Sequence, residues 1–176
     1  MGRPLTLCKS GKLIAGMPHK VHKVQKDGSP VLASPLGAAL KTVVESGIEI
    51  LNHNIETVPR LYGKVRPGHA YDCSLNILHE AKRFRADVLT KSGFMLGVGE
   101  TSEEVMATLR DLREQEVDIV TIGQYLQPSN RQLKVERYVT PEEFQEFKLA
   151  GEKLGFRHIE SGPLVRSSYH AWSHVN

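Results

Sequence analysis

The 176-residue sequence contains only two cysteines, Cys8 and Cys73. A metal cluster held by protein sulfur needs at least three thiolates close together, so these two cannot hold one unaided. No apolar run approaches the length that spans a bilayer, and the N-terminus has no apolar signal-peptide core. Low-complexity tracts are also absent. We therefore expect a globular, cytoplasmic protein without a membrane partner.

The net charge of +3 is unevenly distributed. Residues 1–37 contain six Lys and Arg residues and one acidic residue, whereas residues 38–176 are slightly acidic. A basic arm can bind nucleic acid or anionic lipid. This arm, however, has no interleaved aromatic residues on which bases could stack. We expect residues 1–37 to be a disordered or non-homologous leader, no nucleic-acid partner, and a folded domain over residues 38–176.

From residue 38 onward, apolar segments of helical and extended period alternate. Because strands alternate with helices at this spacing, the pattern predicts parallel strands with outer helices and right-handed crossovers. The fold class is α/β. The expected helices cover residues 38–46 and 71–84 and follow Thr101 and Thr140, and the expected strands are 48–51, 87–100, 117–123 and 156–161.

Several helix ends can be read from single residues. Thr101 with Glu104 and Thr140 with Glu143 have the spacing of a capping box, in which each side chain bonds the other residue's backbone N–H. Gly47 and Gly155 are typical helix stops, since glycine readily adopts the left-handed conformation.

Ligands of parallel βα folds bind at the carboxyl ends of the strands. Polar loops follow each expected strand: NHNIET, GVGET, QYLQPSNR and SGPLVRSSYHA. Asn52 and Asn54 are spaced as alternate strand residues, so both can point toward one ligand. GVGET has neither the dinucleotide fingerprint nor a P-loop lysine. His53 lacks the partners of a metal site, and a hydrogen-bonded histidine at a strand end is the simpler interpretation.

Taken in order, NHNIETVPRLYGKVRPG, TKSGFMLGVGET, TIGQYLQPS, RYVTPEEF and SGPLVRSSYHA resemble the C-terminal half of lipoyl synthase, a radical S-adenosylmethionine enzyme. The resemblance covers about residues 38–172. It implies the C-terminal portion of a partial (β/α) TIM-type barrel. It also implies the insertion of two sulfur atoms into an octanoyl chain, carried by a lipoyl-carrier domain or H protein.

The same resemblance implies S-adenosylmethionine, two 4Fe-4S clusters, and an electron donor such as ferredoxin or flavodoxin. Arg66 and Arg131 are candidates for binding substrate or cofactor carboxylates, or are ordinary surface arginines. Gln132 stands where the family often has histidine. The expected contacts to the adenosyl group are Asn52, Asn54, Met95, Leu96, Gly97 and Tyr125.

The RSSY motif near the end of the chain is similar to the family segment in which a serine ligates one iron of the auxiliary cluster. We expect Ser168 to be that ligand, with Ser167 as the fallback, because spacing does not separate adjacent hydroxyls. A serine oxygen is a poorer partner for this iron than a thiolate, which suits a cluster that is consumed. Arg166 would supply positive charge beside the anionic cluster.

The family's CxxxCxxC motif and its N-terminal cysteine trio have no counterpart here. We therefore expect a fragment without activity of its own. An alternative from another class is a non-catalytic binding module that retains carrier or adenosyl recognition. A third hypothesis is an unrelated α/β-barrel enzyme that uses His53 or Glu100 as an acid–base group, although the sequence offers no partner for either.

Overall fold

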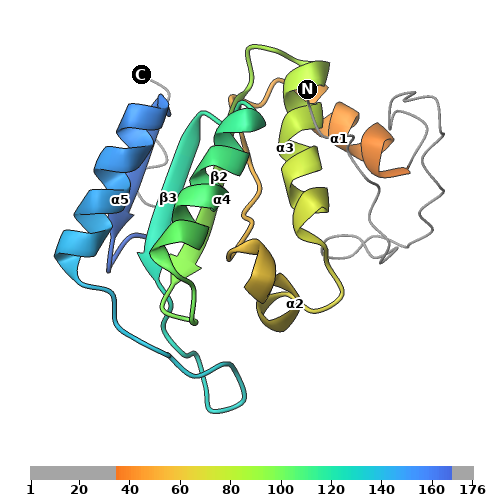
Figure 1. The fold of residues 1–176 in the computed structure, drawn as a ribbon. Coiled ribbons are helices and arrows are strands. Elements are labelled where there is room, and N and C mark those ends of the chain that lie inside the picture. The colour runs from red at the N-terminus through yellow and green to blue at the C-terminus, as the bar shows by residue number, and fades with distance from the viewer. Residues whose placement is uncertain (1–34, 168–176) are drawn as a thin grey trace.

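The computed structural model describes residues 35–167. Four parallel strands form one sheet in the order β1-β2-β3-β4, and helices connect them (Figure 1). The strands are β1 (Ile50–Asn52), β2 (Leu89–Leu96), β3 (Ile119–Gln124) and β4 (His158–Gly162). The helices are α1 (Pro35–Glu45), α2 (Tyr62–Val65), α3 (Tyr71–Phe84), α4 (Ser102–Glu114) and α5 (Pro141–Leu154), with a 3-10 turn, η2 (Pro59–Leu61), before α2. The α/β class and the parallel sheet are confirmed.

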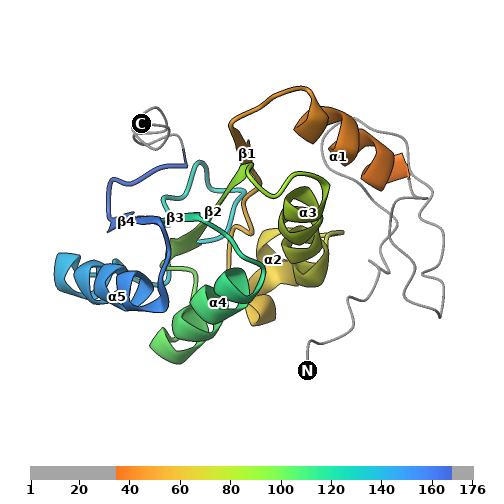
Figure 2. The ribbon, with the colours of Figure 1, turned by 90° about the horizontal axis from the view of Figure 1, so that it is seen from above.

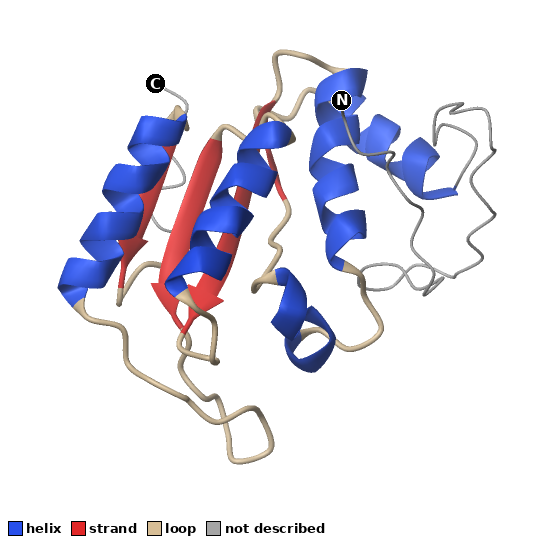
Figure 3. Ribbon diagram, viewed as in Figure 1, coloured by secondary structure: helices blue, strands red, loops and turns tan. Residues whose placement is uncertain are grey.

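Helices α3, α4 and α5 lie side by side on one face of the sheet (Figures 2 and 3). Side chains alternate between the two faces of a strand. Phe94 and Leu96 of β2, and Val120 and Ile122 of β3, therefore point toward these helices and belong to the main hydrophobic core. Lys91, Gly93 and Met95 belong to the other face of β2. A smaller core of Leu40, Val44, Ile77, Ala81 and Val88 joins α1 to α3.

Both predicted capping boxes are present. The Thr101 hydroxyl accepts the Glu104 N–H at 3.3 Å, and the Glu104 carboxylate accepts the Thr101 N–H at 2.9 Å. Thr140 and Glu143 repeat this arrangement at 3.2 and 3.1 Å. Gly155 ends α5 in the left-handed region, with φ of 83°. Each cap satisfies backbone groups that a helix end leaves open, which stabilises the fold by about 1 kcal/mol.

The strand boundaries differ from the sequence prediction by a few residues. The first strand begins at Ile50 rather than at residue 48, because its pairing partner on β2 begins at Leu89. The second strand ends at Leu96, since Gly97 has φ of 103° and turns the chain out of the sheet. The short helix α2 and the turn η2 were not predicted. No helix within residues 35–167 is long and apolar enough to cross a bilayer.

Candidate functional site

A pocket opens at the carboxyl ends of β1, β2 and β3, where the sequence analysis placed the ligand site. The segment after β4 closes one side of it. The pocket is therefore built from four stretches that lie far apart in the sequence. Its lining residues are Asn54, Glu56, Gly93, Phe94, Met95, Thr121, Gly123, Gln124, Leu126, Val165, Arg166 and Ser167.

Two glycines let the backbone form the floor of this pocket. A Cβ atom at Gly93 would lie 2.5 Å from the Thr121 hydroxyl and 3.2 Å from Asn54 Oδ1. A Cβ atom at Gly123 would overlap the carbonyl of Val165. A side chain is therefore excluded at both positions, and glycine lets the neighbouring strand and the segment after β4 pack closely against the strand backbone beneath the pocket.

Asn54 and Glu56 provide the polar groups on the β1 side. Asn54 Oδ1 is buried and accepts no hydrogen bond from the residues of the described part of the chain. Glu56 has φ of 68°, a conformation that is uncommon outside glycine and that often marks a functional position. Its N–H donates to the Gly93 carbonyl at 3.1 Å, and its carbonyl accepts the Met95 N–H at 2.9 Å. These bonds hold Glu56 against the end of β2, beside the unpaired amide oxygen of Asn54.

The segment after β4 carries the residues expected near the auxiliary cluster. Arg166 donates to the carbonyls of Val165 at 2.8 Å and Pro163 at 3.4 Å. Ser167 is half-buried and borders the pocket. Ser168, the preferred iron ligand, lies outside the described residues.

The structure brings only two of the six expected adenosyl contacts to the pocket, namely Asn54 and Met95. Asn52 is exposed at the end of β1, and Leu96 is fully buried in the main core. Tyr125 is buried, and its hydroxyl donates to the Leu133 carbonyl at 2.8 Å. Gly97 has its N–H bonded to the Glu100 carboxylate at 2.6 Å and its carbonyl to the Glu136 N–H at 2.8 Å.

The two candidate carboxylate-binding arginines have different surroundings. Arg66 is half-buried and donates to the Asn54 carbonyl at 3.0 Å and the Tyr62 hydroxyl at 3.2 Å. It therefore supports the backbone that presents Asn54. Arg131 is exposed in the loop between β3 and α5, where the neighbouring Gln132 hydrogen-bonds Ser129.

Neither residue of the acid–base hypothesis has the environment of a catalytic base. Burial, followed by the nearby Arg66 and His69, lowers the pKa of His53 to about 4, so its imidazole is neutral at pH 7. Glu100 is 6% exposed and accepts the backbone N–H groups of Gly97 and Val98 at 2.6 and 3.0 Å. Its carboxylate shapes the turn after β2.

Sequence reasoning missed three polar side chains of the pocket: Glu56, Thr121 and Gln124. Glu56 stands in the quoted NHNIET motif, but its unusual φ has no signal in the sequence. Thr121 lies within the expected strand 117–123, which was identified by its apolar character. Gln124 opens the polar loop QYLQPSNR, so its position directly after that expected strand was the available hint.

The residues of the described part of the chain do not fit an iron–sulfur cluster. Within residues 35–167 no three His, Cys, Asp or Glu side chains gather closely enough to hold a metal ion. The whole chain has two cysteines, fewer than one cluster needs. The pocket, in contrast, combines polar groups with apolar walls and suits an organic ligand.

The fold and this pocket define the chain as a parallel α/β protein with a candidate ligand site at the carboxyl edge of its sheet. No protein-family model matches the chain. Curated proteins named lipoyl synthase, in contrast, match it closely. The chain is 58% identical to the one from Rubrobacter xylanophilus over 133 residues, which is 76% of this chain and 41% of the relative.

Two further relatives agree. The lipoyl synthase of Caldanaerobacter subterraneus subsp. tengcongensis is 55% identical over 76% of this chain and 47% of its own length. That of Idiomarina loihiensis is 57% identical over 70% of this chain and 38% of its own length. The predicted resemblance is confirmed: the chain is related to lipoyl synthases and corresponds to their C-terminal segment. It spans less than half the length of these relatives.

Proposed function

We propose that this chain forms the adenosyl-binding, C-terminal part of a lipoyl synthase, folded as a portion of a (β/α) TIM-type barrel. The observation that carries the proposal is the pocket at the carboxyl ends of β1–β3, formed by a segment that is more than half identical to lipoyl synthases. The four-stranded parallel sheet with helices on one face is compatible with such a barrel.

The chemistry of the pocket suits the nucleoside of S-adenosylmethionine, which supplies the adenosyl group in this family. A carboxylate accepts hydrogen bonds, and an amide both accepts and donates them, so Glu56 and Asn54 can bind ribose hydroxyls. Met95 and Leu126 provide apolar surface for a purine ring, and Gly93 keeps the floor free of side chains. Asn52, which is exposed outside the pocket, would then not contact the nucleoside. Leu96, Gly97 and Tyr125 would support the backbone around the pocket without lining it.

For the auxiliary cluster we propose Ser168 as a ligand of one iron, with Ser167 as the fallback. Ser167 borders the pocket, and Arg166 beside it supplies positive charge. The thiolates of either 4Fe-4S cluster would have to come from outside the described residues. Arg66 and Arg131 are proposed to contribute positive charge near the site. Arg66 would do so from its hydrogen bond to the Asn54 carbonyl.

We further propose that the complete enzyme is a radical S-adenosylmethionine sulfurtransferase. Its substrate would be an octanoylated lipoyl-carrier domain or H protein, its electron donor ferredoxin or flavodoxin, and its location the cytoplasm. The names of the relatives and their high identity support this family function.

Two asparagines provide a matched test of the pocket. Asn54 borders it, whereas Asn52, two residues earlier at the end of β1, is exposed and does not. Binding of S-adenosylmethionine to the chain is measured by calorimetry. Asn54→Ala should weaken binding about tenfold, the loss of one well-placed polar contact, and Asn52→Ala should leave it within about twofold. An absence of binding by the unmodified chain, or equal losses in both variants, would contradict the proposed site.

A further inference from the structure

The loop between β3 and α5, residues 125–140, has neither helix nor strand of its own. It extends away from the sheet beyond the carboxyl ends of the strands (Figure 1). Loops of this length within a compact domain are uncommon and usually functional. This one brings Leu126 to the wall of the pocket, so its conformation determines the shape of the site.

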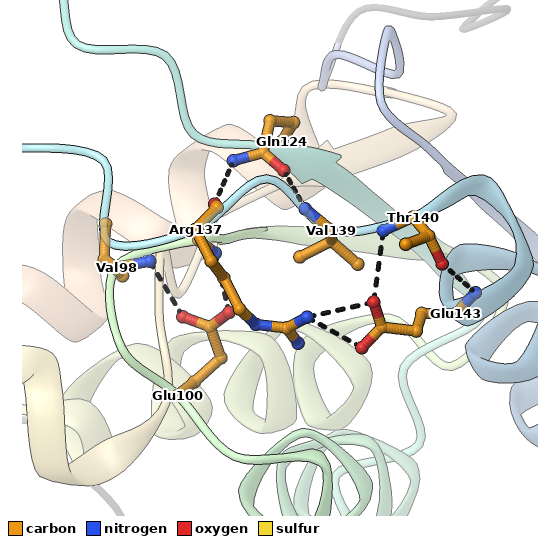
Figure 4. Close-up of polar contacts among 8 residues, drawn as sticks. Val98, Glu100, Gln124, Arg137, Val139, Thr140 and Glu143 are labelled. Atoms are coloured by element: carbon orange, nitrogen blue, oxygen red, sulfur yellow. Dashed lines mark hydrogen bonds and ion pairs between the residues drawn. The ribbon is translucent and has the colours of Figure 1, made fainter.

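One side chain, Gln124 at the end of β3, holds both ends of this loop (Figure 4). Its Oε1 accepts the Val139 N–H at 2.9 Å, and its Nε2 donates to the Arg137 carbonyl at 3.1 Å. The same Nε2 lies 3.1 Å from the Tyr125 carbonyl. Gln124 is 5% exposed, so water cannot easily replace these bonds. We call Gln124, Arg137 and Val139 the loop clamp.

The loop clamp is fitted against the turn after β2. Gly97 has no side chain at the point where a Cβ atom would overlap both Gln124 Nε2 and the Arg137 carbonyl. The Gly97 carbonyl accepts the Glu136 N–H at 2.8 Å, and the Leu96 carbonyl accepts the Tyr125 N–H at 2.8 Å. The end of β2 and the turn after it are therefore hydrogen-bonded to the loop at both of the loop's ends.

The last residues of the loop, directly before α5, are also held by side-chain contacts. Arg137 donates to the two carboxylate oxygens of Glu143 at 2.7 and 2.9 Å, and Glu143 is the acidic member of the α5 capping box. The backbone that Gln124 holds is thus continuous with a stabilised helix start. Residues 126–134, between these ties, carry the exposed Leu126 and Arg131.

We propose that Gln124 is a positioning residue, which holds the loop so that Leu126 forms the pocket wall before a ligand binds. An amide is required because one group must accept from an N–H and donate to carbonyls. A methionine side chain can form neither bond. A glutamate carboxylate would place an oxygen, which cannot donate, against the carbonyls of Tyr125 and Arg137. The identity of the ligand rests on the proposed function, but the role of Gln124 in holding the loop does not.

The test compares Gln124→Met with Gln127→Met in the full chain. Gln127 is a matched control, because its amide donates to the Gln132 carbonyl within the loop tip and it does not line the pocket. Amide hydrogen exchange is followed at Val139 and Glu136 without ligand, and S-adenosylhomocysteine affinity is measured by calorimetry. Gln124→Met should speed exchange at both amides at least tenfold and weaken binding about tenfold. Gln127→Met should change each by less than about twofold.

Gln124→Glu adds a second measurement, the pH dependence of ligand affinity, which a loss of packing alone would not change. The variant's carboxylate should loosen the loop at pH 8. Burial beside the carbonyls of Tyr125 and Arg137 should raise the pKa of this carboxyl above its ordinary value, so that the acid becomes protonated and regains one donor as the pH falls. Affinity relative to the unmodified chain should therefore recover as the pH is lowered to 5.5. Unchanged Val139 exchange in Gln124→Met, or a pH-independent defect in Gln124→Glu, would overturn the positioning role. If the unmodified chain binds no adenosyl ligand, the proposed function fails, and the exchange comparison still decides the role of Gln124.

Discussion

Lys82 of α3 and Asp118, just before β3, form an ion pair of 2.6 Å at the amino-end side of the sheet. Their side chains are 13% and 19% exposed. The same Asp118 oxygen accepts the Thr90 N–H at 2.7 Å, so one carboxylate ties a helix and two strands together. This end of the sheet is built for stability, whereas the opposite end carries the pocket.

Replacing this carboxylate should be costly. Asp118→Ala removes the partner of a largely buried lysine and of the Thr90 N–H, and we expect a loss of about 2–4 kcal/mol in the free energy of unfolding. Urea denaturation measures this loss. Asp87→Ala is the matched control, since Asp87 is 83% exposed in its pair with Arg85 and should change stability by less than about 0.5 kcal/mol. Equal effects would show that the Asp118 network does not stabilise the fold.

His53 should make the fold acid-sensitive. Its pKa in the folded chain is lowered to about 4 from an ordinary value of 6.5, chiefly by burial. The unfolded chain therefore binds a proton more readily. This contribution is fully present above pH 6.5 and is lost as the pH falls toward 4. Between pH 7.5 and 5 the loss is about 2 kcal/mol.

Urea denaturation at these two pH values, with and without His53→Gln, checks this prediction. The variant should show a clearly smaller loss of stability between pH 7.5 and 5, because glutamine does not titrate. An identical pH dependence in both proteins would mean that His53 does not carry the acid sensitivity.

Lys91 of β2 should lower stability at neutral pH. Its side chain is 2% exposed, its Nζ has no hydrogen-bond partner within the described part of the chain, and burial lowers its pKa. Because the folded state disfavours the charged form, stability should rise as the pH increases toward 10. Lys91→Met should raise the free energy of unfolding at pH 7 by on the order of 1 kcal/mol. The exposed Lys153→Met serves as control, and a loss of stability specific to Lys91→Met would point to a partner for this ammonium.

The sequence predicted the features that depend on local chemistry. The capping boxes at Thr101 and Thr140 and the left-handed stop at Gly155 need only residues within one turn. The parallel order of strands followed from their alternation with helices. The carboxyl-end pocket followed from the general geometry of such sheets.

Side-chain direction was the part that the sequence could not supply. Asn52 and Asn54 stand two positions apart, as residues on one face of a strand do. Of the two, only Asn54 borders the pocket, because the paired strand β1 ends at Asn52. Gln124 was missed since its role depends on Arg137 and Val139, which reach it through a long loop. Ser168 stays a prediction, because it lies outside the described residues.

Lipoyl formation by a chimera tests the family function most directly. Residues 38–176 are joined to the N-terminal part of the Rubrobacter xylanophilus relative, and lipoyl product on an octanoylated carrier is measured with S-adenosylmethionine and a reductant. We expect product from the chimera. Ser168→Ala should abolish that product while 5′-deoxyadenosine still forms, and Ser167→Ala should be milder. A folded chimera that binds S-adenosylmethionine but makes no lipoyl product would contradict the account.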